Sequence, residues 1–197
     1  MSIIHVLTAL LSRADSLANA KAAMLHSPAL TRIMFFITSI GGTISMLVLS
    51  LLVLGFLAYK KRWQSIFLFA VGMGGGLISE LLLKMLVHRA RPENALAQEI
   101  GYSFPSGHAT LAIIFFSLLI YIFRDDIKKE LWKHVFIISC IFIALLIGFS
   151  RVYLNVHWLS DVIGGFALGV LWLSITIAVS KAMFKTKTIK PEENKIT

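Results

Sequence analysis

Five apolar stretches separated by short polar loops constrain the fold of this 197-residue chain more than any other feature. The stretches cover residues 33–59, 63–83, 107–123, 135–150 and 160–180. A helix needs about 20 mainly apolar residues to cross a bilayer, and these stretches approach or exceed that length. In hydrocarbon, backbone N–H and C=O groups must pair within the protein, which favours helices over open sheets. The sequence therefore predicts an all-α, polytopic transmembrane bundle of five to six helices.

The net charge of +9 is distributed in a way that argues against nucleic-acid binding. Basic residues gather in residues 60–62, in residues 124–134 and after the last apolar stretch, and they form no continuous face with interleaved aromatics. Lysine and arginine in short loops favour the cytoplasmic side. We therefore predict a membrane protein with a cytoplasmic C-terminus and no nucleic-acid partner. Residues 84–106 and 151–159 then lie on the extracytoplasmic side.

The two ends of the chain differ from the apolar middle. Residues 3–11 are apolar but too short to span, and the charged Arg13 and Asp15 follow them. An amphipathic helix lying in the outer interface fits this pattern. Residues 1–184 are expected to form one membrane-embedded domain. The polar residues 185–197 are expected to form a disordered cytoplasmic tail.

Four glycines crowd the second apolar stretch, at Gly72, Gly74, Gly75 and Gly76. Small residues allow helices in a membrane to approach closely. No lysine follows at the spacing of a phosphate-binding loop. We interpret the glycines as packing positions.

His157 and Asp161 are four residues apart, which on a helix places them on one face. A carboxylate that accepts from one imidazole nitrogen fixes the tautomer and raises the basicity of the other nitrogen. The free nitrogen could attack phosphorus. The alternative is a pair that only caps a helix.

Three cations, Lys84, Arg91 and Arg151, fall on the predicted outer side. They would repel one another unless an anion joined them, and an arginine fork matches phosphate oxygens. Each could otherwise be an interfacial charge that reaches for water. Glu80 lies one turn before Lys84, so we expect the two to pair, although Glu80 could instead face a cavity. His88 and Arg89 could touch a lipid headgroup or lie on the surface without function.

Residues 105–108, Pro-Ser-Gly-His, predict a turn into the helix that begins near residue 107. Backbone N–H groups at a helix start favour an anion, and Gly107 allows close approach. Ser106 can donate a hydrogen bond or cap the helix. His108 has the chemistry to protonate a leaving alkoxide.

Together these segments resemble the signature of the type 2 phosphatidic acid phosphatase family. The chain carries a lysine with Arg-Pro seven residues later, then Pro-Ser-Gly-His, and then Ser-Arg with a histidine six residues after that arginine and an aspartate four residues further on. The resemblance implies a core like that of acid phosphatases and vanadium haloperoxidases, in a bacterial plasma membrane. Bacterial members have six spans, and here the first is missing or shortened.

The resemblance also implies roles for the site residues. His157 would attack and become phosphorylated, Asp161 would orient it, and His108 would protonate the leaving lipid oxygen and later activate water. The phosphoryl oxygens would be held by Lys84, Arg91, Ser106, the Gly107 amide and Arg151. The family uses no metal and no cofactor, and no obligate protein partner is evident.

The sequence leaves the substrate and two other classes of function open. Phosphatidylglycerophosphate or phosphatidic acid is the preferred lipid substrate, and undecaprenyl diphosphate is the alternative. His108, His157 and Asp161 could instead ligate zinc, although the nearby cations would repel it. Charges within a membrane also mark transporters, so a non-enzymatic transporter or scaffold is the remaining alternative.

Overall fold

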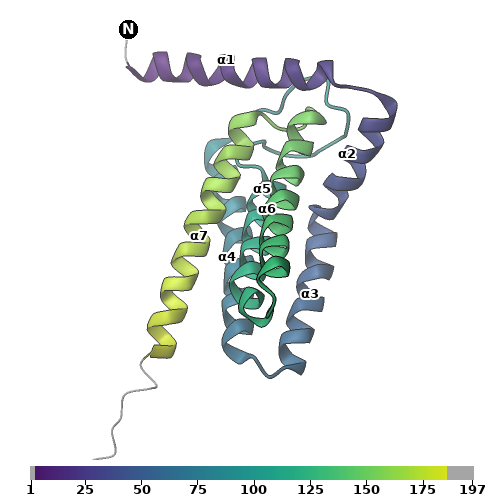
Figure 1. The fold of residues 1–197 in the computed structure, drawn as a ribbon. Helices are drawn as coiled ribbons and strands as arrows, with labels where there is room; N and C mark the ends of the chain where they lie inside the picture. Colours follow the sequence, from purple (N-terminus) through teal and green to yellow (C-terminus); the bar gives the residue numbers. More distant parts are fainter. Residues whose placement is uncertain (1–2, 186–197) are drawn as a thin grey trace, which may run out of the picture.

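A computed structural model describes residues 3–185 as a helical bundle capped by one crossing helix (Figure 1). The elements are α1 (Ile3–Met24), α2 (Pro28–Ile40), α3 (Thr43–Tyr59), α4 (Trp63–Val87), α5 (Gly107–Phe123), η1 (Arg124–Asp126), α6 (Glu130–Tyr153) and α7 (Leu159–Lys185). Among the described residues, four helices are long and apolar enough to cross a membrane, and there are five spans if the bent pair α2–α3 is counted as one. This confirms the predicted all-α transmembrane bundle. The expected tail falls mostly on residues 186–197, which lie outside the described part.

The predicted stretch 33–59 is divided into α2 and α3, which meet at an angle of 49°. Gly41 and Gly42 form the break between them. A Cβ at Gly41 would lie 2.4 Å from Ile147 Cγ2 of α6, so only glycine fits there without displacing that helix. The close approach of the break to α6 therefore favours glycine at this position, which the hydropathy of the stretch does not encode.

The helix α5 is the centre of the bundle, packed against α4, α6 and α7. Its side chains Ala112, Ile114 and Leu118 are fully buried. The predicted packing role of the α4 glycines agrees with their surroundings, because a Cβ at Gly76 would lie 2.2 Å from Ile114. The exception is Gly74, which has open space around it.

The helix α1 lies across one end of the bundle, roughly perpendicular to the other helices (Figure 1). The loop between α4 and α5 and the loop between α6 and α7 lie at this same end, beneath α1. The predicted outer segments 84–106 and 151–159 are therefore neighbours in space.

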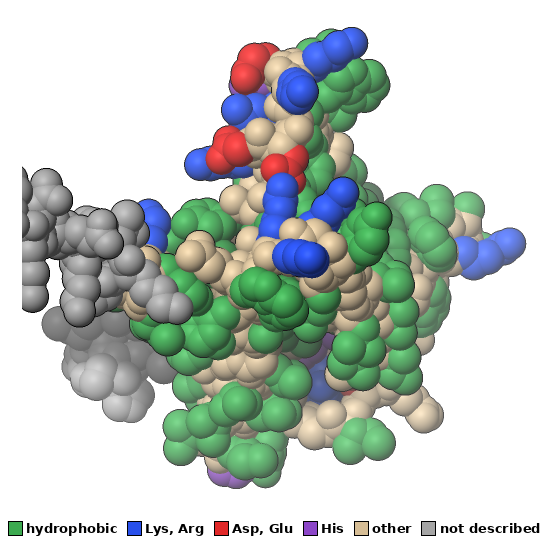
Figure 2. Space-filling view, turned by 90° about the horizontal axis from the view of Figure 1, so that it is seen from below, with side chains coloured by type: hydrophobic (Ala, Val, Ile, Leu, Met, Phe, Trp, Pro, Cys, Tyr) green, Lys and Arg blue, Asp and Glu red, His purple; other side chains and the backbone are tan. Residues whose placement is uncertain are grey.

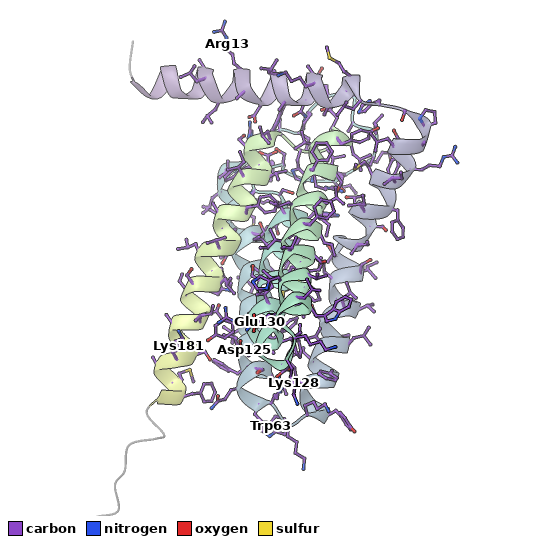
Figure 3. All side chains as sticks on the ribbon, viewed as in Figure 1. Arg13, Trp63, Asp125, Lys128, Glu130 and Lys181 are labelled. Atoms are coloured by element: carbon purple, nitrogen blue, oxygen red, sulfur yellow. The ribbon has the colours of Figure 1, made fainter. Side chains whose placement is uncertain are left out.

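The opposite end of the bundle carries the charged loops. Viewed from below, Lys and Arg side chains gather there with Asp and Glu, and hydrophobic side chains cover the flanks (Figure 2). Asp125, Lys128 and Glu130 lie at this end (Figure 3). Arg62 and Asp126 join two of its loops through an ion pair of 2.7 Å. The loops at residues 60–62 and 124–134 thus lie together at the end of the bundle opposite α1.

Candidate active site

Three loop segments are tied together beneath α1. The Ser106 amide donates to the Asp161 carbonyl at 3.0 Å, and the Leu96 amide donates to the Leu154 carbonyl at 2.9 Å. A Cβ at Gly165 would lie 2.7 Å from the Ser106 carbonyl oxygen, so this glycine lets α7 approach the start of α5. These contacts place the Pro-Ser-Gly-His turn beside the His157–Asp161 segment.

His157 lies in the turn before α7, and Asp161 lies in the first turn of that helix. The expectation that one helix face carries both residues is therefore corrected, because α7 begins only at Leu159. The His157 Nδ1 atom lies 3.5 Å from Asp161 Oδ2. That oxygen also accepts hydrogen bonds from the Trp158 amide at 2.9 Å and from Ser103 Oγ at 2.8 Å. The bond to Trp158 is half of a capping box, so Asp161 both starts the helix and faces the imidazole.

The His157 imidazole is only 2% exposed. Burial, partly offset by Asp161 and reinforced by Arg151 and Arg91, lowers the pKa of His157 to about 4. The ring is therefore neutral at neutral pH and keeps a lone pair on one nitrogen.

The guanidinium of Arg91 lies at the other edge of this imidazole, with Nη1 3.3 Å from His157 Nε2. Arg91 is held by the carbonyls of Val156 at 2.8 Å and Gly101 at 3.0 Å. A donor beside Nε2 and a carboxylate beside Nδ1 together favour the tautomer protonated at Nδ1. The nitrogen with the lone pair then faces the cation.

Arg151 is buried at the end of α6, where its side chain donates to Thr38 Oγ1 at 2.6 Å and forms an ion pair with Glu99. Glu99 also lies 3.9 Å from Arg91 Nη2. Burial raises the pKa of the Glu99 carboxyl, but the adjacent Arg151 outweighs this and holds that pKa below its usual value. A loop carboxylate therefore sits between the two arginines.

Lys84 and Glu80 of α4 form an ion pair of 2.6 Å, as their spacing predicted. Glu80 is buried against the start of α5, where a Cβ at Gly107 would lie 2.8 Å from Glu80 Oε1. A side chain at position 107 would therefore push Glu80 away from Lys84. This contact fixes Lys84 relative to the Pro-Ser-Gly-His turn.

Besides His157 Nδ1, two buried donors in the site have no hydrogen-bond partner: Ser106 Oγ and Arg151 Nε. Buried polar groups are nearly always paired, so both are positioned to meet an acceptor that enters the site. His108, in the first turn of α5, is within electrostatic range of Arg151 and Lys84, and also of His157. All eight residues predicted for the site thus belong to one end of the bundle.

Besides Glu99, further residues that were not assigned to the site from sequence hold its side chains in place. Thr38 bonds Arg151, Ser103 bonds Asp161, and Arg89 donates to Asp161 Oδ1 at 2.6 Å and to Asp15 at 2.6 Å. The only sequence signal for Arg89 was a positive charge on the predicted outer side. Within residues 3–185, no group of three or more His, Cys, Asp or Glu side chains is arranged to hold a metal ion.

Comparisons with known proteins agree with the motifs. A model of the PAP2 superfamily matches residues 63–185. Phosphatidylglycerophosphatase B of Bacillus subtilis is 35% identical over 162 residues, which cover 80% of this chain and 79% of that protein. A lipid A 1-phosphatase of Rhizobium johnstonii is 33% identical over 133 residues, which cover 62% of this chain and 50% of that protein.

Solved structures show the same architecture. A transmembrane PAP2-type phosphatidylglycerolphosphate phosphatase from Bacillus subtilis superposes with a TM-score of 0.79 at 30% identity, covering 92% of this chain and 89% of the other. LpxE of Aquifex aeolicus superposes with a TM-score of 0.68 at 21% identity, covering 83% of this chain and 94% of the other. The second likeness concerns the fold alone.

Proposed function

Because this chain belongs to the PAP2 superfamily and is a membrane lipid phosphatase, we propose that His157 is its covalent nucleophile. The observation that carries this proposal is the placement of the neutral imidazole, with Nδ1 facing Asp161 and Nε2 lying 3.3 Å from Arg91. A phosphoryl group bound by the arginine would bring its phosphorus to the nitrogen that holds the lone pair.

In the first step, His157 Nε2 attacks phosphorus and the bond from phosphorus to the lipid oxygen breaks. His108 donates a proton to that leaving oxygen. The Asp161 carboxylate, 3.5 Å from Nδ1, stabilises the positive charge that develops on the ring. In the second step, His108 takes a proton from water, the resulting oxygen attacks phosphorus, and the bond to His157 breaks to release phosphate.

The transferred group carries negative charge throughout, so its stabilisation is the main task of the site. In this proposal, charge is supplied by Lys84, Arg91 and Arg151. Ser106 Oγ and the Gly107 amide complete the set of donors. Removing one preorganised donor of this kind costs roughly 2.7–4 kcal/mol of activation free energy.

An apolar groove of about 350 Å³ between α3 and α4 supports a lipid with acyl chains as substrate. It is lined by Met46, Leu47 and Phe69, and it begins near Thr43. The adjacent Gly42 would place a Cβ 4.0 Å from His108 Nε2, so the groove starts beside the proposed acid. A chain in the groove would set the lipid oxygen next to His108. We propose phosphatidylglycerophosphate or phosphatidic acid as the substrate, with undecaprenyl diphosphate as the alternative.

The distribution of charge supports a site on the extracytoplasmic side of a bacterial plasma membrane. The basic loops lie at the opposite end of the bundle from the site, and lysine and arginine favour the cytoplasmic side. The partners in this proposal are the bilayer and its lipid phosphates. The described residues belong to a single membrane-embedded domain in this reading.

The decisive experiment combines phosphate release with trapping of the intermediate. The full-length protein is incubated with the three lipids, quenched rapidly, and examined for an acid-labile phosphoryl group on His157. The His157→Ala variant should keep its fold and lose both turnover and label. His134→Gln, at the charged end of the bundle, is the matched control and should keep both. Normal turnover by His157→Ala would refute the nucleophile assignment.

A further inference from the structure

The helix α1 turns one face toward the segment that carries the nucleophile. Asp15, Asn19 and Ala22 are all buried on this face. Their spacing of four and three residues aligns them along one side of a helix. The side-chain amide of Asn19 donates to the His157 carbonyl at 3.2 Å and to Asn155 Oδ1 at 2.6 Å. An anchor that only rested on the membrane would need none of these contacts.

Asp15 makes charged contacts from this face. Its Oδ1 accepts from the Ser160 amide at 2.8 Å, and its Oδ2 accepts from Ser160 Oγ at 2.7 Å and from Arg89 Nη2 at 2.6 Å. The other terminal nitrogen of Arg89 donates to Asp161 Oδ1 at 2.6 Å. An unbroken series of charged contacts thus runs from α1 to the aspartate that faces the nucleophile.

The position of Arg89 between two carboxylates has a chemical consequence. Asp161 uses Oδ1 for Arg89, and it turns Oδ2 toward His157 Nδ1 at 3.5 Å. Asp15 is 2% exposed and Asp161 is fully buried, so Arg89 is needed to compensate both charges. Without Asp15, the guanidinium would be free to turn wholly onto Asp161 and compete with the imidazole for its oxygens.

We propose that Asp15 is a positioning residue for catalysis, which fixes Asp161, and thereby His157, through Arg89. The proposal rests on the function proposed above, because it assigns Asp15 to the support of that nucleophile. It makes α1 a part of the catalytic apparatus in addition to its place at the end of the bundle. The opposite face of α1 serves as the comparison, since Arg13 points away from the bundle (Figure 3).

The test is the Asp15→Asn variant of the full-length protein, which keeps the size of the side chain and removes its charge. Turnover is expressed per active site, and active sites are counted as the protein molecules that accept a phosphoryl group. Unfolded protein therefore does not lower the measured kcat. We expect kcat per site to fall roughly tenfold to a hundredfold, as when outer partners of a reactive group are removed, with KM within about twofold. Arg13→Gln, which changes one charge on the outward face, should match the wild type. Asp15→Glu should recover part of kcat.

A double-mutant cycle separates positioning from general stability. If Asp15 acts through Arg89, the variant Asp15→Asn with Arg89→Gln should be no slower than Arg89→Gln alone, since both changes break the same series of contacts. If the losses in kcat of the two single variants multiply in the double variant, the inference is overturned. It is also overturned if Asp15→Asn keeps a kcat per site within about twofold of the wild type. An active His157→Ala variant would instead overturn the proposed function, so the two failures can be distinguished.

Discussion

The carboxylate of Glu99 occupies the space between the two arginines where a phosphoryl group should bind. It forms an ion pair with Arg151 and lies 3.9 Å from Arg91. Its lowered pKa keeps it ionised at neutral pH. An incoming phosphate must therefore displace a negative charge, and we predict that Glu99→Gln binds phosphate analogues more tightly than the wild type.

The size of the effect follows from the geometry. Two unit charges 3.9 Å apart interact with about 4 kcal/mol at an effective dielectric constant of about 20. The Glu99 side chain is 29% exposed, so water screens part of this interaction. A glutamine would still donate and accept hydrogen bonds but would not hold the arginines by charge. A net gain of about 1–2 kcal/mol corresponds to binding that is tighter by about 5- to 30-fold.

Vanadate inhibition measures this directly, because vanadate mimics the transferred phosphoryl group and needs no lipid. The inhibition constant of vanadate should fall by about 5- to 30-fold in Glu99→Gln. The control is Glu93→Gln, which removes another carboxylate from the same loop and should leave the inhibition constant unchanged. An inhibition constant that stays the same or rises would contradict this prediction. It would show that Glu99 holds the arginines in place and does not compete with the ligand.

Four further predictions concern pH, stability and metal dependence. Because the pKa of His157 is lowered to about 4, kcat/KM should fall on the acid side near pH 4 and not near 6.5, once the substrate's own titration near pH 6 is subtracted. The same shift should lower the free energy of unfolding as the pH falls from 6.5 toward 4, because the imidazole takes up a proton at a higher pH in the unfolded protein than in the folded protein. The His157→Ala variant should lose less stability over this pH range. In α4, Gly75→Ala should destabilise the protein by about 1–3 kcal/mol, because the new Cβ would lie 1.9 Å from Trp172. The loss should appear as a lower Tm in detergent. The control is Gly74→Ala, which adds a Cβ in open space and should leave Tm unchanged. Phosphate release should survive EDTA, and loss of activity on chelation would revive the zinc alternative.

The helices and the motif set could be predicted from the sequence because they depend on local information. The prediction of a helix over residues 107–123 matches α5 (Gly107–Phe123), since this stretch is apolar throughout and starts at a glycine turn. The Glu80–Lys84 ion pair follows from a spacing of four residues on one helix. The spacing of the motifs also carried the resemblance to the family that the comparisons then showed.

The contacts that hold the site together depend on the packing of distant segments and could not be predicted from the sequence. Gly41 approaches Ile147 of α6 closely, and the bond from Ser160 to Asp15 joins residues 145 positions apart. No spacing rule links such positions, because their contact depends on how whole helices pack. The sequence thus determined which groups are present and how far along each helix they lie, whereas the packing of α1 and the loops decided that Arg89 faces Asp161 and that Glu99 lies between the arginines.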